Sequence, residues 1–168
     1  MIEYVGGNLF DSNCQTLVCT VNCEGVMGKG IALQFKKKFP QMFLGYRAEC
    51  DVGVQLKNGG DFWLYTYPDR VYAFYYDADG ELRPGWQSKI LCFATKEHWR
   101  NKSKYKWIER GLERFVYAYE HKIYGIDTIT SIAFPKLGCE NGGLDWLVVK
   151  PIMEKYLSRL PIKVEIYI

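Results

Sequence analysis

The chain has 168 residues, of which 48% are hydrophobic and 24% are charged, and its formal net charge is +3. This composition fits one globular domain with a packed core and excludes an intrinsically disordered chain. The sequence contains neither a secretory leader pattern nor an apolar run long enough to cross a bilayer, so we expect a cytoplasmic protein with no membrane partner.

The hydrophobic pattern predicts strands and helices that alternate along the chain. Strands are expected in seven segments: 1–4, 16–21, 62–67, 71–76, 89–94, 128–134 and 162–168. Helices are expected at 28–39, 42–50, 104–124 and 144–160. Pro40 is expected to end the first helix, residues 77–80 to form a hairpin turn, and Pro151 to lie near the start of the last helix or at a kink. This alternation indicates one domain, residues 1–168, with an α/β fold and a mixed sheet.

Cysteine spacing argues against disulfide and zinc chemistry. No pair of the six cysteines has CxxC spacing, and Cys19 and Cys92 lie inside apolar, strand-like runs. We therefore expect reduced, mostly buried thiols and no metal site.

A glycine-rich segment, Thr20 to Gly30, joins the second expected strand to the first helix. Glycine lets the backbone approach a ligand closely, and the first N–H groups of a helix attract anions, so the segment is typical of a phosphate-binding turn. It is not a P-loop, because no Ser or Thr follows Lys29 to hold magnesium. A glycine turn that merely begins a helix is the alternative, but Asn22 at a buried strand end favours hydrogen bonding to a ribose hydroxyl.

A second segment of this kind runs from Phe134 to Trp146. Two glycine loops at the carboxyl ends of neighbouring strands can clamp a diphosphate through backbone N–H groups, without a metal ion. Within this segment, Asp145 is expected to stabilise the first turn of the following helix.

The third segment, Cys92 to Arg100, places Lys96 just past the end of a strand. A lysine there can do chemistry if it lines the same cleft as the two glycine loops. It is followed by a basic stretch that also contains aromatic residues, from Lys96 to Trp107, which suits a polyanion such as a nucleic acid. The alternative for this stretch is a solvated helix face.

Four ordered motifs carry a family resemblance: Gly7 to Phe10, Thr20 to Ala32, Thr95 to Arg100 and Pro135 to Trp146. Together they resemble a macrodomain and, within macrodomains, the DarG-type DNA ADP-ribosyl glycohydrolases. A more distant similarity is to the human terminal ADP-ribose protein glycohydrolase. The resemblance covers nearly the whole chain and implies a macrodomain-like three-layer α/β/α fold with a central mixed sheet and a cleft for ADP-ribose.

The resemblance also implies roles for individual residues. Lys96 would be the catalytic residue, acting where the N-glycosidic bond joins C1″ of the ribose. Residues implied in ADP-ribose binding are Asn8, Leu9, Asn22, Met27, Gly28, Lys29, Gly30, Thr95, Leu137, Gly138, Cys139, Glu140, Asn141, Gly142 and Gly143. Adenosine is expected near Asn8 and Leu9, the distal ribose near Asn22, and the diphosphate between the two glycine loops. Contacts with DNA are expected from His98, Trp99 and Arg100.

Two roles for Lys96 stay open at this point. A neutral amine would attack C1″ and form a covalent adduct, whereas a charged one would orient or protonate the substrate. Free lysine titrates at ~10.4, so attack near neutral pH requires a lowered pKa. Desolvation, together with nearby Arg100 or His98, would lower it.

Two positions depart from the family pattern. Glu140 stands where related sequences often have Gly, and it either points away from the diphosphate or serves Lys96 as an acid/base partner. Gly142 stands where the human relative has a catalytic aspartate, so a mechanism through that aspartate is not expected. The segment 68–88 is also longer than usual; its aromatics, with Arg70 and Arg83, extend a nucleic-acid surface or form a hairpin with no ligand role.

The resemblance implies removal of ADP-ribose from thymidine bases in single-stranded DNA. The expected partners are ADP-ribosylated single-stranded DNA, ADP-ribose and a DNA ADP-ribosyltransferase toxin, with no cofactor. Three other functions remain open: hydrolysis of ADP-ribosylated protein carboxylates, non-catalytic reading of ADP-ribose, and a structural interaction module that only holds its toxin. Whether the chain is a trimmed antitoxin domain or a stand-alone enzyme also remains open.

Overall fold

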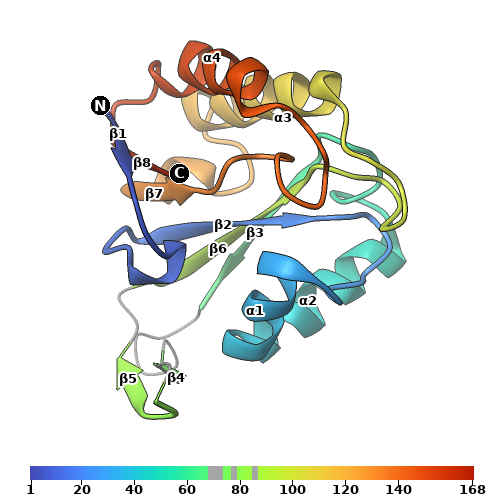
Figure 1. The fold of residues 1–168 in the computed structure, drawn as a ribbon, viewed down its shortest axis with the longest axis vertical. Coiled ribbons are helices and arrows are strands. Elements are labelled where there is room, and N and C mark those ends of the chain that lie inside the picture. The colour runs from blue at the N-terminus through green and yellow to red at the C-terminus, as the bar shows by residue number, and fades with distance from the viewer. Residues whose placement is uncertain (68–73, 77–78, 85–86) are drawn as a thin grey trace.

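A six-stranded sheet forms the middle layer of the molecule (Figure 1). The computed structural model describes residues 1–67, 74–76, 79–84 and 87–168. The strands, in their order across the sheet, are β1 (Ile2–Val5), β8 (Lys163–Tyr167), β7 (Ser131–Phe134), β2 (Thr16–Val21), β6 (Lys89–Ala94) and β3 (Phe62–Thr66). Neighbours are parallel except for β3, which runs antiparallel to β6, so the expected mixed sheet is confirmed.

Helices cover both faces of this sheet (Figure 1). On one face lie α1 (Gly30–Lys38) and α2 (Pro40–Val52), and on the other lie α3 (Tyr105–Glu120) and α4 (Trp146–Leu157). Two short 3-10 helices, η1 (Leu9–Asp11) and η3 (Ile126–Thr128), lie in the connections. The expected three-layer α/β/α arrangement is confirmed.

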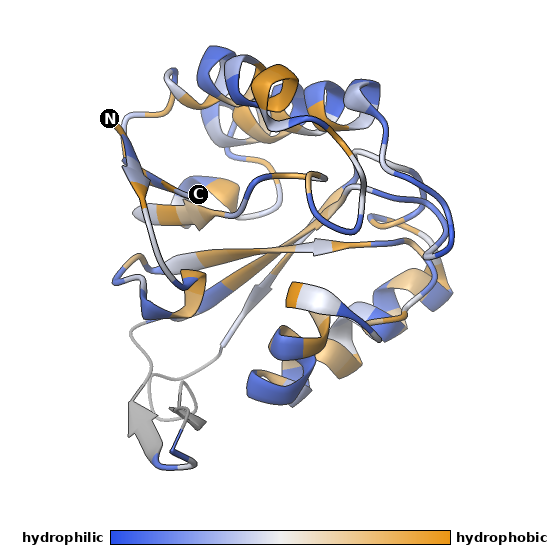
Figure 2. Ribbon diagram, viewed as in Figure 1, coloured by the Kyte–Doolittle hydropathy of each residue, from blue (hydrophilic) through white to orange (hydrophobic). Residues whose placement is uncertain are grey.

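The central strands β2 and β6 are almost continuously apolar because each of their faces meets a helical layer. Alternate side chains of a strand point to opposite faces. Val18 therefore joins the core beneath α3 and α4, whereas Leu17 and Cys19 join the core beneath α1 and α2. Figure 2 shows hydrophobic residues along the strands and hydrophilic residues on the outer sides of the helices.

Local backbone geometry, and not the hydrophobic pattern, sets where three elements begin or end. α3 ends at Glu120 instead of 124, because the turn that follows holds Lys122 and Tyr124 at positive φ values of 55° and 57°. α1 begins at Gly30, two residues later than expected. β7 begins at Ser131, since η3 occupies the start of the segment expected to be a strand.

α4 runs from Trp146 to Leu157 instead of over the expected 144–160, with Asp145 at its start. Asp145 caps the helix, and its carboxylate accepts a hydrogen bond of 2.9 Å from the Leu147 N–H. Pro151 lies inside α4 rather than near its start. It removes the N–H that would pair with the Leu147 carbonyl, and Leu147 is 79% exposed, so water can take the place of that donor. Pro40 ends α1 as expected and is also the first residue of α2.

A two-stranded antiparallel sheet, β4 (Phe74–Tyr76) with β5 (Leu82–Pro84), confirms the hairpin expected around residues 77–80. Residues 68–73, 77–78 and 85–86 lie outside the described residues, and so do Arg70 and the side chain of Arg83. Within the described ranges, no helix is long and apolar enough to cross a bilayer.

Candidate active site

Three segments that follow parallel strands meet at one edge of the sheet. We call residues 22–30 the β2 loop, residues 95–100 the β6 turn and residues 135–143 the β7 loop. They surround a cavity of about 340 Å³. The predicted site residues that line it are Asn22, Gly28, Lys29, Thr95, Lys96, Trp99, Gly138, Glu140, Asn141 and Gly142.

A second cavity of about 420 Å³ adjoins the first. Both are lined by Ile31, Pro135, Lys136 and Glu140, so the two hollows meet along these residues. Three further predicted site residues, Asn8, Leu9 and Gly30, line only the second cavity. The structure therefore separates Asn8 and Leu9 from Lys96 by the junction between the cavities.

Other predicted site residues support the loops without lining either cavity. Met27 and Leu137 are fully buried in the two halves of the core. The Cys139 thiol donates to the carbonyl of Leu137 at 3.5 Å. Gly143 adopts a positive φ of 74° and donates its N–H to the carbonyl of Glu140 at 3.0 Å.

Asn22 holds the β2 loop in shape. Its amide oxygen accepts hydrogen bonds from the Glu24 N–H (2.9 Å), the Val26 N–H (3.4 Å) and the Tyr46 hydroxyl (2.9 Å). Its amide nitrogen donates to the Val26 carbonyl at 2.7 Å. The other N–H of the amide has no hydrogen-bond partner among the described residues, and Asn22 lines the cavity. Asn22 therefore braces its own loop, a role that the sequence reasoning did not foresee.

The β2 and β7 loops meet at Gly30 and Asn141. Gly30 has a φ of +59°, and a Cβ added there would lie 2.4 Å from the Asn141 amide nitrogen. A side chain at position 30 is therefore disfavoured both by backbone strain and by close approach. The backbone carbonyl of Asn141 accepts a hydrogen bond of 2.9 Å from Lys96 Nζ.

The β7 loop is folded tightly upon itself and against Ser103. Leu144 N–H donates to the Gly138 carbonyl at 2.9 Å, and Ser103 N–H donates to the Gly142 carbonyl at 3.0 Å. A Cβ at Gly142 would lie 2.3 Å from Ser103 Oγ and 2.4 Å from the Gly138 oxygen. Any side chain at 142 would thus displace the loop, so the geometry agrees with a mechanism that does not use an acid there.

Lys96 and Lys136 both line the cavity and are half-buried. Desolvation by burial and, secondarily, the positive charge of Lys29 lower the pKa of Lys96 below its ordinary value. The neighbours expected to lower it, Arg100 and His98, are not among the causes. A lowered pKa increases the fraction of neutral, nucleophilic amine at a given pH.

Trp99 lies at the edge of the first cavity and is 46% exposed. His98 stacks on it with ring centroids 5.6 Å apart, and the Arg100 guanidinium lies 4.7 Å from the Trp99 ring centroid. The His98 Nδ1 accepts a hydrogen bond of 3.1 Å from the Arg100 N–H. His98 and Arg100 thus hold the indole rather than line the cavity.

Several cations near the cavities have no acidic partner within the described part of the chain. Among the described residues, no carboxylate forms an ion pair with Lys29, Lys96, Arg100, Lys102 or Lys136. Uncompensated positive charge attracts anions such as a diphosphate or a nucleic-acid backbone.

All six cysteines are free thiols. Burial raises the pKa of Cys23, the thiol within the β2 loop, to about 12, so it is a weak nucleophile. The described residues contain no group of three or more His, Cys, Asp or Glu side chains arranged to hold a metal ion.

Comparison with known proteins places this geometry in context. No family model matches the chain. The DNA ADP-ribosyl transferase–DNA ADP-ribosyl glycohydrolase fusion protein of Thermosipho africanus is 39% identical over 169 residues, which cover 99% of this chain and 42% of the fusion protein. The chain spans about two fifths of the length of the curated relatives it matches.

Solved structures show the same relationship. The structure of Thermosipho africanus DarTG in complex with ADP-ribose matches 99% of this chain and 41% of its own, at 37% identity and a TM-score of 0.83. The macrodomain of Mycobacterium tuberculosis DarG matches 99% of this chain and 97% of its own, at 36% identity and a TM-score of 0.79. The expected resemblance is confirmed, and the chain belongs to the DarG macrodomain family.

Proposed function

We propose that this protein removes ADP-ribose from thymidine bases in single-stranded DNA and so reverses a DNA ADP-ribosyltransferase toxin. Curated relatives that carry the name DNA ADP-ribosyl glycohydrolase support the reaction. The structural observation that carries it is the position of Lys96, whose half-buried amine faces the cavity between two glycine loops. We further propose that residues 1–168 act as a single macrodomain in the cytoplasm.

The two adjoining cavities are proposed to hold ADP-ribose along their length. The diphosphate would lie between Gly28 to Gly30 and the β7 loop, where backbone N–H groups can meet it without a metal ion. The adenosine would occupy the second cavity beside Asn8 and Leu9. The distal ribose would lie by the remaining amide N–H of Asn22, close to Lys96.

The lowered pKa of Lys96 favours the covalent role. In the first step the Nζ lone pair forms a bond to C1″ while the bond from C1″ to the base nitrogen breaks. The leaving base takes that electron pair, and it recovers a proton from the newly formed ammonium group. Water then attacks C1″ while the bond from C1″ to Nζ breaks. One proton of the water passes to Nζ, which leaves as the neutral amine of Lys96, and the other stays on the new C1″ hydroxyl of the released ADP-ribose.

The Trp99 platform is proposed to receive the DNA. His98 and Arg100 lie against the indole, and the part of Trp99 that stays exposed at the edge of the cavity would stack on a base, a contact worth ~1–3 kcal/mol in single-strand binding proteins. Lys102 and Lys104 lie further along the same stretch and are exposed, where they can meet phosphates. Affinity for modified DNA should therefore fall as salt rises, whereas affinity for free ADP-ribose should change less.

The first test follows Lys96→Ala on a thymidine-ADP-ribosylated oligonucleotide. We expect hydrolysis to fall at least ~1,000-fold while ADP-ribose still binds, and Lys155→Ala, an exposed lysine of α4, to behave as wild type. A trapped adduct of one ADP-ribose on wild type and none on Lys96→Ala would identify the nucleophile. Undiminished modification after long incubation with wild type would refute the proposal.

The pH dependence gives the second test. Because attack needs the neutral amine, the rate should rise with pH and level off above the lowered pKa of Lys96. Lys29 is the nearby cation that lowers this pKa, and Glu140 is a carboxylate lining the same cavity. Lys29→Gln should therefore move the rise to higher pH. A rate that falls across this range would show that the charged amine is required.

Competition between substrates separates the remaining alternatives. A hydrolase of ADP-ribosylated protein carboxylates would prefer a modified peptide over modified DNA. A reader would bind ADP-ribose tightly and turn over neither substrate.

A further inference from the structure

The β6 turn that carries Lys96 is held from two sides by backbone hydrogen bonds. On the side of the β2 loop, Thr95 N–H donates to the Val21 carbonyl at 3.0 Å, and Cys23 N–H donates to the Glu97 carbonyl at 3.0 Å. On the other side lies the segment 57–61, which immediately precedes β3. The position of Lys96 therefore depends on a segment that belongs to neither glycine loop.

Two backbone hydrogen bonds join segment 57–61 to Ala94, the residue that precedes the β6 turn. The Ala94 N–H donates to the Asp61 carbonyl at 2.8 Å, and the Gly60 N–H donates to the Ala94 carbonyl at 2.7 Å. A third contact comes from the Gly59 N–H, which donates to Glu97 Oε1 at 3.3 Å. These contacts bracket Lys96, because Ala94 and Glu97 lie on either side of it in the chain.

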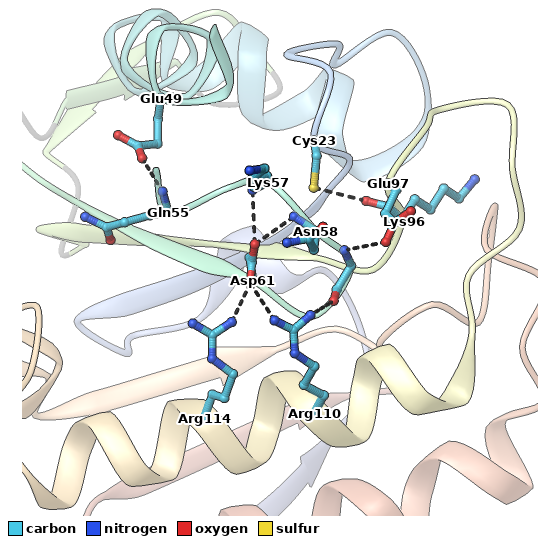
Figure 3. Close-up of polar contacts among 11 residues, drawn as sticks. Cys23, Glu49, Gln55, Lys57, Asn58, Asp61, Lys96, Glu97, Arg110 and Arg114 are labelled. Carbon is cyan, nitrogen blue, oxygen red and sulfur yellow. Dashed lines mark hydrogen bonds and ion pairs between the residues drawn. The ribbon is translucent and has the colours of Figure 1, made fainter. Parts of the chain in front are cut away.

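The Asp61 carboxylate fixes this segment (Figure 3). Asp61 is 5% exposed, and its Oδ2 accepts hydrogen bonds from the backbone N–H groups of Lys57 (3.0 Å) and Asn58 (2.7 Å). Its Oδ1 pairs with the guanidinium groups of Arg110 (3.4 Å) and Arg114. A buried carboxylate with charged and backbone partners on both oxygens is held in one orientation.

Helix α3 supplies the other half of this anchor. Figure 3 shows Arg110 and Arg114 reaching from α3 toward Asp61, with Lys96 and Glu97 at the far end of the same network. Arg110 also donates to the Gly59 carbonyl at 2.8 Å. A Cβ at Gly59 would lie 2.2 Å from the Trp107 ring, so this segment lies flat against α3.

We propose that Asp61 is a positioning residue for Lys96, which it orients from the opposite side of the β6 turn through segment 57–61. The inference rests on the proposed function of Lys96 as the attacking amine. Asp61 does not line either cavity, so it acts on the reaction only through the backbone that carries Lys96. Displacement of a catalytic group by about 1 Å can cost ~100-fold in rate.

Asp61→Asn tests this directly. The amide oxygen can still accept from the backbone N–H groups of both Lys57 and Asn58, but the charge that pairs with the two arginines is lost. We expect kcat on ADP-ribosylated DNA to fall ~10- to 100-fold while the Kd for free ADP-ribose stays within threefold of wild type. A purely structural role would instead weaken binding and turnover together, or neither.

Two more variants test whether a loss of activity in Asp61→Asn comes from misfolding. Arg110→Ala removes a half-exposed side chain and should lower kcat ~3- to 10-fold without loss of folded protein. Met153→Ala removes a fully buried side chain of α4 on the same side of the sheet. Below the melting temperature of this variant, its kcat should stay within twofold of the wild-type value. If Asp61→Asn is folded and its kcat is within twofold of wild type, the inference is wrong.

The pKa of Lys96, measured by NMR, provides a readout that does not need turnover. A displaced amine would regain water, so we expect its pKa to rise in Asp61→Asn, with Lys29, Lys136 and Glu140 unchanged around it. An unchanged pKa would overturn the positioning role. If wild type fails to hydrolyse any ADP-ribosylated substrate, the proposed function falls, while this measurement still decides the role of Asp61.

Discussion

The two glycine loops around the cavity share a composition but are held in different ways. The β2 loop is braced by one side chain, because the buried Asn22 amide bonds four groups within and behind it. The β7 loop is braced by its own backbone and by close packing of Gly138 and Gly142 against Ser103. A phosphate-binding surface can thus be made rigid by a polar side chain, as in the β2 loop, or by the absence of side chains, as in the β7 loop. Different substitutions should therefore disrupt the two loops.

The largest effect is expected from Gly142→Ala in the β7 loop. The added Cβ would meet Ser103 Oγ and the Gly138 oxygen inside 2.5 Å, and the Gly138 oxygen belongs to a backbone that cannot turn aside. We expect ADP-ribose affinity, measured by calorimetry, to fall at least ~100-fold, or about 2.8 kcal/mol. Gly6→Ala is the control, since no atom lies within 4 Å of a Cβ there. Affinity within threefold of wild type would show that the loop is pliable.

Asn22→Ala should break the β2 loop with a smaller effect. It leaves the N–H groups of Glu24 and Val26 without this acceptor, whereas the Tyr46 hydroxyl keeps the backbone carbonyl of residue 22, to which it donates at 2.8 Å. We expect ~1–3 kcal/mol less free energy of unfolding in urea, and ~10-fold weaker ADP-ribose binding. Tyr46→Phe removes one donor and should cost about 1 kcal/mol. An equal loss of unfolding free energy in Asn22→Ala and Tyr46→Phe would mean that the other hydrogen bonds of the Asn22 side chain do not hold the loop.

Gly30→Ala probes the point where the loops touch. The αL backbone at φ +59° costs an alanine ~1–2 kcal/mol, whereas the Asn141 amide nitrogen it would meet is the end of a flexible side chain. ADP-ribose binding should weaken ~3- to 10-fold. Adding Asn141→Ala removes the clash but not the strain, so affinity should not recover in the double variant; full recovery would assign the effect to the clash.

The smallest effect is expected from Ser103→Ala. The buried hydroxyl has no hydrogen-bond partner among the described residues, while the N–H that holds Gly142 belongs to the backbone and is kept. We expect the free energy of unfolding to change by no more than ~0.5 kcal/mol, with any change toward greater stability. A loss above ~1 kcal/mol in thermal unfolding would reveal that the hydroxyl has a partner.

Sequence reasoning could locate the site because strand ends are local signals. β2 and β6 are uninterrupted apolar runs, and parallel neighbours must present their following loops at one edge of the sheet. That rule alone brings Asn22, Lys96 and Asn141 together. The family resemblance then assigned these residues roles that remain to be tested.

The support behind the site could not be predicted in this way. Asp61 and Arg110 are separated by 49 residues, so no periodicity or motif connects them. Tyr46 reads as one more aromatic on an amphipathic helix, although its hydroxyl reaches Asn22. The only available signal for Asp61 was Gly59-Gly60 before a strand, which predicts a tight turn but not its partners.

The place of β8 in the sheet has a consequence for the order of folding during synthesis. This strand, Lys163–Tyr167, follows the other strands of the sheet along the sequence, yet it pairs with both β1 and β7, so it joins β1 to the rest of the sheet. While the ribosome is still making residue 160, β1 has no strand to pair with in that sheet. Completion of the sheet therefore waits for the synthesis of residues 163–167, and pairing across such a large sequence separation is slow. A nascent chain stalled before Lys163 should remain open to proteases at its amino-terminal strand.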